Sequence, residues 1–392
     1  MEDLIAKYVD KLDRQGLSAP EETLLGFLDD TAVWSRSTPA TRELQRVFGL
    51  LAVNSLLLAR PQEPYRTIID CLAAEPGEAI TPNDSETRTF LHDIPIVREL
   101  SAETIAAALS RRKCAILPDH GIVTAGSVSP EQTFIHFSSV CFASFVTFFS
   151  ELLESARSGD RIPRRRREAF AQAVSLLPEM PGEKAAHPYL VRGPFLNEAA
   201  VIAAMDQAGK EVVRLGLVDS FFGNISYRLD NTIYISQTSS SLDELPGCID
   251  PCPVDGSSTA AVTASSELSA HKDILAKTGC LAVLHGHPKF SVIMSMLCEV
   301  SDCELRGECH RRCPRERSVC GFPIVSGEVG TGPFGLCRTV PDAILANGAA
   351  IVFGHGVFTT GRQDFTDALA RLVHVESACR EDYFRHLKGM LP

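Results

Sequence analysis

The sequence predicts an α/β protein made of two related halves joined by an exposed linker. Three observations favour this class: a repeated strand-like motif, helix-like stretches that alternate with short apolar runs, and an arginine- and proline-rich segment near the middle of the chain. We expect a first domain over residues 1–160, a linker over 161–190 and a second domain over 191–392. A chain of 392 residues is also longer than one ordinary core usually needs.

The composition is typical of a folded globular protein, with 45% hydrophobic and 22% charged residues. The formal net charge of −11 disfavours nonspecific binding to nucleic acid or anionic lipid, because both require positive protein surface. No apolar run approaches the roughly 20 residues that cross a bilayer, and the charged N-terminal stretch reads as an amphipathic helix rather than a signal peptide. We therefore expect a cytoplasmic protein that binds neither nucleic acid nor membrane.

The internal repeat joins two pairs of segments. AILPDHGIVTAG at residues 115–126 matches AIVFGHGVFTTG at 350–361, and in both an apolar run leads into His-Gly before a helix-like stretch. A weaker match joins SLLLARP at 55–61 to AVLHGHP at 282–288, each preceded by a helical stretch and broken at proline. The halves therefore look like diverged copies of one α/β unit.

Polar chemistry is confined to the second copy. Leu58 and Arg60 stand in the first copy where His285 and His287 stand in the second. His120 remains in the first copy, but a lone histidine does not make a metal site. We expect the first half to be a degenerate, truncated and structural copy.

A metal site is predicted where the second copy carries its histidines. CLAVLHGHP reads as a short strand that follows a helix ending at Gly279, and strand alternation places His285 and His287 on one face. His355 follows a second apolar run and is the natural third ligand. Three imidazoles and an open position suit a catalytic zinc ion.

The helix before this strand begins with two serines and a glutamate. Ser265 or Ser266 could cap the helix, and Glu267 could serve as a metal ligand or, once substrate displaces it, as a base. The alternative is that Glu267 only interacts favourably with the positive end of the helix dipole.

A cysteine-rich insertion at 298–320 interrupts the second half. Its spacing, C-x4-C-x5-C-H-x2-C-x6-C, is compatible with a second metal site, either structural zinc or an iron–sulfur cluster, although it matches no standard motif. Thiols without a metal are the alternative. The insertion carries five arginines, which could attract an anionic substrate or simply solvate a loop. The cysteines concerned are Cys298, Cys303, Cys309, Cys313 and Cys320.

From about Glu198 to Leu387 the sequence resembles the class II aldolase/adducin family, which includes fuculose-phosphate aldolases and ribulose-phosphate 4-epimerase. The markers occur in the family's order: GNIS (223–226), ISQTS (235–239), SSE (265–267), HGH (285–287), GTGPFG (330–335) and GHG (354–356). The resemblance implies a three-layer α/β/α domain that binds a divalent metal, most simply zinc, through the three histidines and Glu267, which then becomes the acid/base group.

The resemblance also implies a pocket for a phosphate or another anionic group of the substrate. Its residues would be Gly223, Asn224, Thr238, Ser265 and Ser266. The sequence departs from the family at Ser239, where the aldolases have glycine, and at the insertion, which stands where they carry a catalytic acid. The acid is therefore not transferable.

The expected function is that of a zinc-dependent lyase in carbohydrate metabolism, which cleaves or forms a carbon–carbon bond next to a carbonyl in a sugar or sugar-phosphate-like substrate through an enediolate. An epimerase, dehydratase or decarboxylase would use the same chemistry. A non-enzymatic adducin-like protein or a metal- or redox-responsive protein is the alternative of another class. The family's fourfold rings, combined with the repeat, imply a homodimer with pseudo-fourfold symmetry in which residues 1–160 border the active site.

Overall fold

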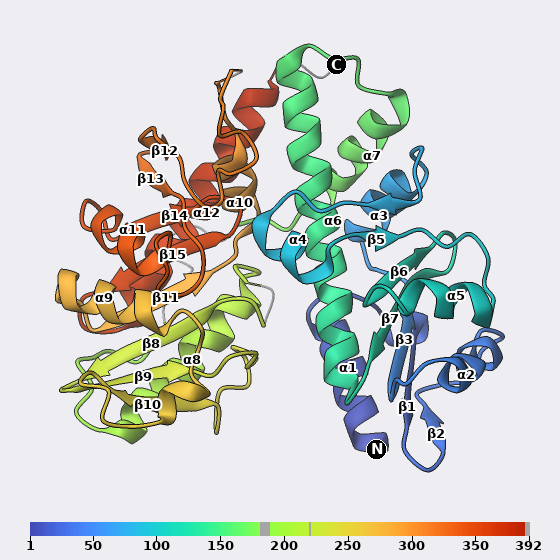
Figure 1. Cartoon of the computed structure of the whole chain (residues 1–392), viewed down its shortest axis with the longest axis horizontal. Helices are drawn as coiled ribbons and strands as arrows, with labels where there is room; N and C mark the ends of the chain where they lie inside the picture. Colours follow the sequence, from blue (N-terminus) through green and yellow to red (C-terminus); the bar gives the residue numbers. More distant parts are fainter. Residues whose placement is uncertain (181–188, 219–220, 301, 389–392) are drawn as a thin grey trace. The chain divides into compact units, whose positions relative to one another are not determined.

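The computed structural model describes residues 1–180, 189–218, 221–300 and 302–388. The chain divides into two compact units, Met1–Pro178 and Glu179–Met390, and each has its own main sheet with helices packed on it (Figure 1). The linker predicted at 161–190 lies partly in 181–188, outside the described residues.

The elements of the first unit follow one another in this order: α1 (Glu2–Arg14), the 3-10 turn η1 (Pro20–Glu22), β1 (Thr23–Leu28), β2 (Ala32–Trp34), α2 (Thr41–Leu50), β3 (Ser55–Ala59), α3 (Tyr65–Ala73), β4 (Ala79–Ile80), α4 (Ser85–Leu91), β5 (Ile94–Pro95), α5 (Ala102–Leu109), β6 (Cys114–Leu117), β7 (Gly121–Gly126), α6 (Pro130–Ser158) and α7 (Arg164–Ser175). The main sheet has the order β2-β1-β3-β7-β6, and all its neighbours are antiparallel. Helices α2 and α5 share a core with one face of this sheet, and α6 packs against β3 and β7.

The linker prediction was wrong for residues 164–175, which form α7 and pack on α3 of the first unit. The arginine run is not simply solvated. The Arg166 side chain is buried and forms ion pairs with Glu75 at 3.0 Å and Glu151 at 2.6 Å. A sequence-local argument cannot see these carboxylates, because they come from distant parts of the chain.

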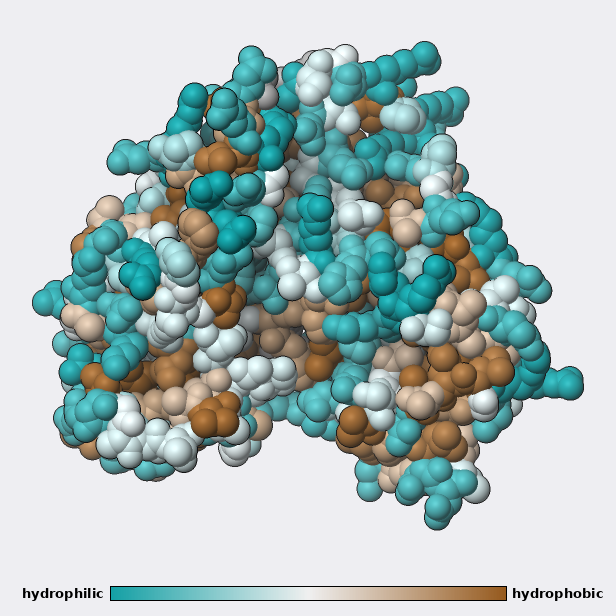
Figure 2. Space-filling view, viewed as in Figure 1, coloured by the Kyte–Doolittle hydropathy of each residue, from teal (hydrophilic) through white to brown (hydrophobic). Residues whose placement is uncertain are grey.

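Helix α6 corrects the expectation that no apolar stretch is long enough to cross a membrane. By length and composition it qualifies, with a mean hydropathy of 1.5 over an 18-residue window, but 83% of that window is buried within the structure. We therefore assign α6 as a core helix of the first unit, and its phenylalanines fill the interior. On the face shown in Figure 2, hydrophilic residues predominate and hydrophobic ones appear in small groups.

The elements of the second unit are α8 (Glu198–Arg214), β8 (Asn224–Leu229), β9 (Thr232–Ser236), β10 (Ile249–Pro253), the 3-10 turn η2 (Ala260–Val262), α9 (Leu268–Thr278), β11 (Ala282–Gly286), α10 (Lys289–Met296), β12 (Arg317–Val319), β13 (Phe322–Val325), α11 (Leu336–Ala343), β14 (Ala349–Val352), β15 (Gly356–Gly361) and α12 (Phe365–Leu387). The sheet order is β10-β9-β8-β11-β15-β14-β13-β12. Only the β13–β14 pair is parallel among the described strands of this sheet.

Helices cover both faces of this sheet, so the second unit is a mixed α/β structure with three layers. On one face α9 and α11 pack together over a core that includes Val283, Ala350 and Phe358. Helix α12 packs on β11 and β15, and α8 and α10 pack against it. The sequence predicted α9 and β11, but it did not predict that β15 follows the His-Gly turn directly and forms a hairpin with β14.

Five strands follow the same order in the two sheets. The order β2-β1-β3-β7-β6 of the first unit corresponds to β9-β8-β11-β15-β14 of the second. The registers also correspond, because Leu58 pairs with Val123 as His285 pairs with Phe358, and these residues match in the repeats. The repeat in the sequence therefore coincides with a shared strand order and register.

Candidate metal centre

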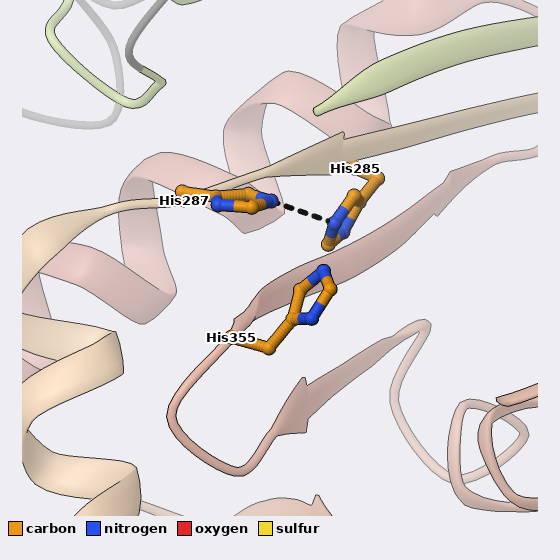
Figure 3. Close-up of side chains that lie close together, drawn as sticks. All are labelled: His285, His287 and His355. Carbon is orange, nitrogen blue, oxygen red and sulfur yellow. Dashed lines mark hydrogen bonds between the residues drawn. The ribbon is translucent and has the colours of Figure 1, made fainter. Parts of the chain in front are cut away.

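Two neighbouring chain turns bring three histidines together at one end of β11 and β15 (Figure 3). His285 lies near the end of β11, His287 follows the strand by one residue, and His355 lies in the tight turn between β14 and β15. In the described part of the chain, these are the residues whose ligand atoms all lie within 4.8 Å of one another. The predicted ligand set is thus brought into one place.

The three imidazoles are buried, with side chains that point toward a common centre. The Nε2 atoms of His285 and His287 lie 2.9 Å apart. The Nδ1 atom of His285 donates to the carbonyl of Val357 at 3.2 Å, which leaves its Nε2 lone pair facing the other histidines. Fixing one ring nitrogen by a backbone carbonyl in this way is the usual means of orienting a metal-binding histidine.

The electrostatics of the site fit a cation. Burial lowers the pKa of His285 to about 4 and holds the pKa of His287 well below its ordinary value. Both rings are therefore neutral at pH 7 and can offer lone pairs. Buried polar atoms without a hydrogen-bond partner among the described residues include Glu267 Oε1 and His287 Nδ1. Because such atoms are costly to bury, the donor set fits a bound divalent metal.

Glu267 borders the histidines on one side. Its carboxylate oxygens lie 3.3 Å from Nε2 of His285 and 3.3 Å from Nε2 of His355. Burial raises the pKa of this carboxyl, but interactions with His285, His355 and the amide of Asn224 lower it more, so the group is held ionised. The carboxylate is therefore available either as a further ligand or as a base.

Glu267 is the N-cap residue of α9, which corrects the prediction that Ser265 or Ser266 caps this helix. No side chain accepts a hydrogen bond at the cap position, although Ser265 Oγ accepts from the backbone N–H of Glu267 at 3.3 Å. The carboxylate is instead turned toward the histidines.

Glycine is required at two positions around the site. A Cβ atom on Gly356 would lie 2.5 Å from the carbonyl oxygen of Gly286 and 2.8 Å from ring carbons of both His285 and His287. Gly223 has φ +99°, and a Cβ there would lie 2.5 Å from the carbonyl oxygen of His285. The GHG and GNIS motifs thus allow the backbone to pass close behind the imidazoles.

The residues expected to bind an anion fall into two groups. Thr238 and Ser266 meet on the surface, where the Ser266 N–H donates to the Thr238 hydroxyl at 3.2 Å, and Ser265 lies buried beside them. Ser239 has φ 61°, so it keeps the left-handed backbone that favours glycine at this position. The side chain of Asn224 differs, because its amide donates to Glu267 at 2.6 Å rather than facing an anion.

Sequence reasoning missed two buried side chains. His271, in α9, contacts both Asn224 and Ser226, and its spacing of one helical turn from Glu267 was the signal that could have found it. Glu376, in α12, accepts the N–H groups of Phe290 and Ser291 at 2.9 and 2.8 Å. It thereby fixes the start of α10 just after His287, and no local pattern links residues so far apart.

The five cysteines of the insertion do not form a metal site in the structure. Within the described residues, no three of them bring their sulfur atoms within 4.8 Å of one another, and all five are free thiols. The Cys320 thiol instead contacts the carbonyl of Ala378 at 3.4 Å, and the Cys309 thiol that of Leu305 at 3.8 Å. The expectation of a cluster-binding loop is not supported by this arrangement.

Arginine contacts and strand pairing hold the insertion in place. Arg317 donates to the carbonyls of Ser295 and Leu297 and lies over the ring of Phe353, just before the His355 turn. Arg311 pairs with Glu328 at 2.9 Å, and β12 pairs with β13 at the edge of the sheet. These arginines are used within the fold, which weakens the expectation that they attract substrate.

The three histidines and Glu267 lie within a part of the chain that matches a known family. Residues 203–383 match the family model described as Class II Aldolase and Adducin N-terminal domain. A search of curated proteins gives no match.

Several solved structures are similar to about half of the chain. L-fuculose-1-phosphate aldolase from Thermus thermophilus is 22% identical, with a TM-score of 0.40, over 49% of this chain and 96% of that one. A sugar-phosphate aldolase from Thermotoga maritima is 21% identical, with a TM-score of 0.36, over 48% and 96%. L-fuculose 1-phosphate aldolase from Glaciozyma antarctica PI12 is 15% identical, with a TM-score of 0.35, over 55% and 81%. Residues 203–383 therefore form a domain of the class II aldolase and adducin family.

Proposed function

We propose that the second unit is a zinc-dependent lyase that cleaves or forms a carbon–carbon bond next to a carbonyl in a sugar or sugar-phosphate-like substrate. The observation that carries the proposal is the convergence of three buried histidines beside an ionised Glu267. Three nitrogen ligands with an open position are the arrangement of catalytic zinc sites. The zinc ion would supply a Lewis acid for the substrate's carbonyl and hydroxyl oxygens.

The residues of the chain would carry the proton transfer. In the cleavage direction Glu267 takes the proton from the hydroxyl on the carbon that becomes the new carbonyl. The electron pair of the broken bond then stays on the other fragment as an enediolate, and the proton held by Glu267 is transferred to it to give the product and restore the carboxylate. Thr238 and Ser266, exposed beside the site, are our candidates for holding a phosphate or carboxylate of the substrate.

The test combines a metal count with a substrate screen. Purified protein is depleted with a chelator, reloaded with zinc, manganese or magnesium, and assayed with phosphorylated and unphosphorylated ketoses for aldehyde release. We expect aldehyde only in the metal-loaded protein and loss of both metal and activity in His285→Ala. Release of aldehyde by metal-free protein would contradict the proposal. Conversion of the substrate to an epimer without carbon–carbon cleavage would favour the epimerase alternative.

We also propose that the first unit is a degenerate copy of the second. The shared strand order and register support this, and His120 occupies the position of His355. If the backbone is equivalent, the double variant Leu58→His, Arg60→His should bind one additional divalent ion. The same pair in a His120→Ala background is the matched control. A folded double variant with no additional ion would contradict the proposal.

An assembly and a compartment are proposed as well. We infer a cytoplasmic homodimer with pseudo-fourfold symmetry, in which degenerate and active units alternate. Light scattering should give twice the chain mass of 42.6 kDa. A monomer at the concentration of the activity assay would contradict the inference.

A further inference from the structure

A line of buried polar side chains runs behind Glu267, away from the histidines. Ser226 Oγ lies 2.7 Å from His271 Nδ1, and His271 Nε2 contacts Asn224 Oδ1. The amide nitrogen of Asn224 then donates to Glu267 Oε2 at 2.6 Å. Ser226 and His271 are fully buried, and Asn224 and Glu267 are nearly so.

The hydrogen-bonding capacities of the groups fix the direction of this chain. An ionised carboxylate only accepts, so Asn224 must turn its NH2 group to Glu267 and its carbonyl oxygen to His271. His271 must then carry its proton on Nε2 and accept the Ser226 hydroxyl on Nδ1. Burial lowers the pKa of His271 to about 3, so the ring is neutral and has one donor and one acceptor, as this chain requires.

The first unit shows that the fold does not need these polar groups. Leu24 lies opposite Leu58 in the first unit, and Asn224 lies opposite His285 in the second. Two residues further along the strand, Gly26 lies opposite Leu56 in the first unit, and Ser226 lies opposite Val283 in the second. The shift in residue number that relates Leu58 to His285 also relates Leu44 to His271. The same shift relates Ala40, the N-cap residue of α2, to Glu267, the N-cap residue of α9.

All four equivalents in the first unit are apolar or glycine. Leu24, Ala40 and Leu44 belong to the core under the first sheet. The polar chain is thus absent together with the metal-binding histidines, in a unit with the same strand order. A purely structural role for the chain would leave this joint replacement unexplained.

We propose that His271 is a positioning residue that orients the amide of Asn224 and thereby holds the carboxylate of Glu267 for proton transfer. The proposal rests on the proposed function for its kinetic consequence, but the geometry is independent of the reaction. Without the Nε2–H donor, the Asn224 amide could rotate and turn its oxygen toward Glu267, where two acceptors would repel each other.

The geometry is tested first in the metal-free protein. In protein with 15N-labelled histidine, NMR should find the His271 proton on Nε2, and a proton on Nδ1 would overturn the proposal whatever the enzyme does. A crystal structure of His271→Leu, the residue that the first unit carries here, should show a reoriented Asn224 amide or a displaced Glu267 carboxylate. An unchanged contact between Asn224 and Glu267 would also overturn it.

The kinetic test compares His271→Leu with His271→Gln. A glutamine amide reaches about as far as Nε2 and can still donate to Asn224, whereas leucine cannot. Losses caused by such outer contacts are typically 10- to 100-fold, so we expect kcat of the leucine variant to fall by about that factor, with metal content and KM little changed. The glutamine variant should recover most of kcat.

The experiments distinguish a purely structural role of His271 from a failure of the proposed function. If His271 only fills space, leucine and glutamine lower kcat in step with thermal stability, and this outcome overturns the proposal. If the wild-type protein has no lyase activity with any substrate, the functional proposal fails, while the NMR and crystallographic results still decide the role of His271.

Discussion

Replacing Gly356 by alanine is the most direct probe of how tightly the histidines are packed. The added Cβ would lie 2.8 Å from ring carbons of His285 and His287 and 2.5 Å from the carbonyl oxygen of Gly286. Carbon atoms attract best at roughly 3.5–4.0 Å, so each imidazole must move by about 0.7 Å. Gly356 does not have a positive φ, so alanine adds no backbone strain.

The displacement sets the size of the expected effect. Metal–ligand distances are held to about ±0.2 Å, so a shift about three times larger should weaken metal binding by roughly 10- to 100-fold. Overpacking of this kind costs about 1–3 kcal/mol of folding free energy. For a unit of this size that corresponds to a fall of roughly 2–12 °C in the unfolding temperature of the metal-free protein.

The assay is a zinc titration against a competing chelator, followed by thermal unfolding with and without zinc. The transition that zinc raises belongs to the unit that binds it. Gly332→Ala is the matched control, because a Cβ there meets nothing within 4 Å and the residue has no positive φ. Wild-type zinc affinity and stability in Gly356→Ala would refute the reasoning, and so would an equal loss in the control.

Further predictions concern the base, acid stability and the insertion. Glu267→Gln should keep the fold and most metal affinity but lose at least about 100-fold in turnover, and near-normal turnover would restore the helix-dipole interpretation. In metal-free protein, His285 and His271 bind protons in the unfolded state below a pKa of about 6.5, but in the folded state burial lowers their pKa to about 4 and about 3. Burial also holds the pKa of His287 well below its ordinary value. Stability is therefore intact above about pH 6.5 and should fall by about 1.4 kcal/mol per pH unit for each histidine as the pH drops toward 4, and a flat profile in urea unfolding would contradict this. Serine in place of all five insertion cysteines should leave metal stoichiometry unchanged by mass spectrometry, whereas loss of an ion would restore the second metal site.

The sequence predicted the histidine site because its signals are local. The period of a strand places His285 and His287 on one face, and the repeated His-Gly motif pointed to His355. The role of Asn224 could not be read in this way, since its amide contacts Glu267 and His271, which lie far along the chain. An amide in a GNIS motif suits an anion and a carboxylate partner equally well until the tertiary structure places one of them beside it.

The insertion illustrates a second limit. Five cysteines close together in sequence suggested a metal, because a polar loop has little apolar surface to order it. The structure orders the segment by other means, with Arg317 on the carbonyls at the end of α10 and β12 paired to β13. Similarly, the run around Arg166 read as solvated because the carboxylates of Glu75 and Glu151 are remote in sequence.

The central claim is that His285, His287 and His355 hold one divalent metal ion, and a metal count tests it most directly. Wild-type protein and His285→Ala are purified in parallel without added metal, loaded with one zinc ion per chain, passed through a chelating resin and analysed by mass spectrometry. We predict one ion per chain in the wild type and none in His285→Ala, with both proteins folded. Wild-type protein that retains no ion, or a variant that retains as much as the wild type, would contradict the claim.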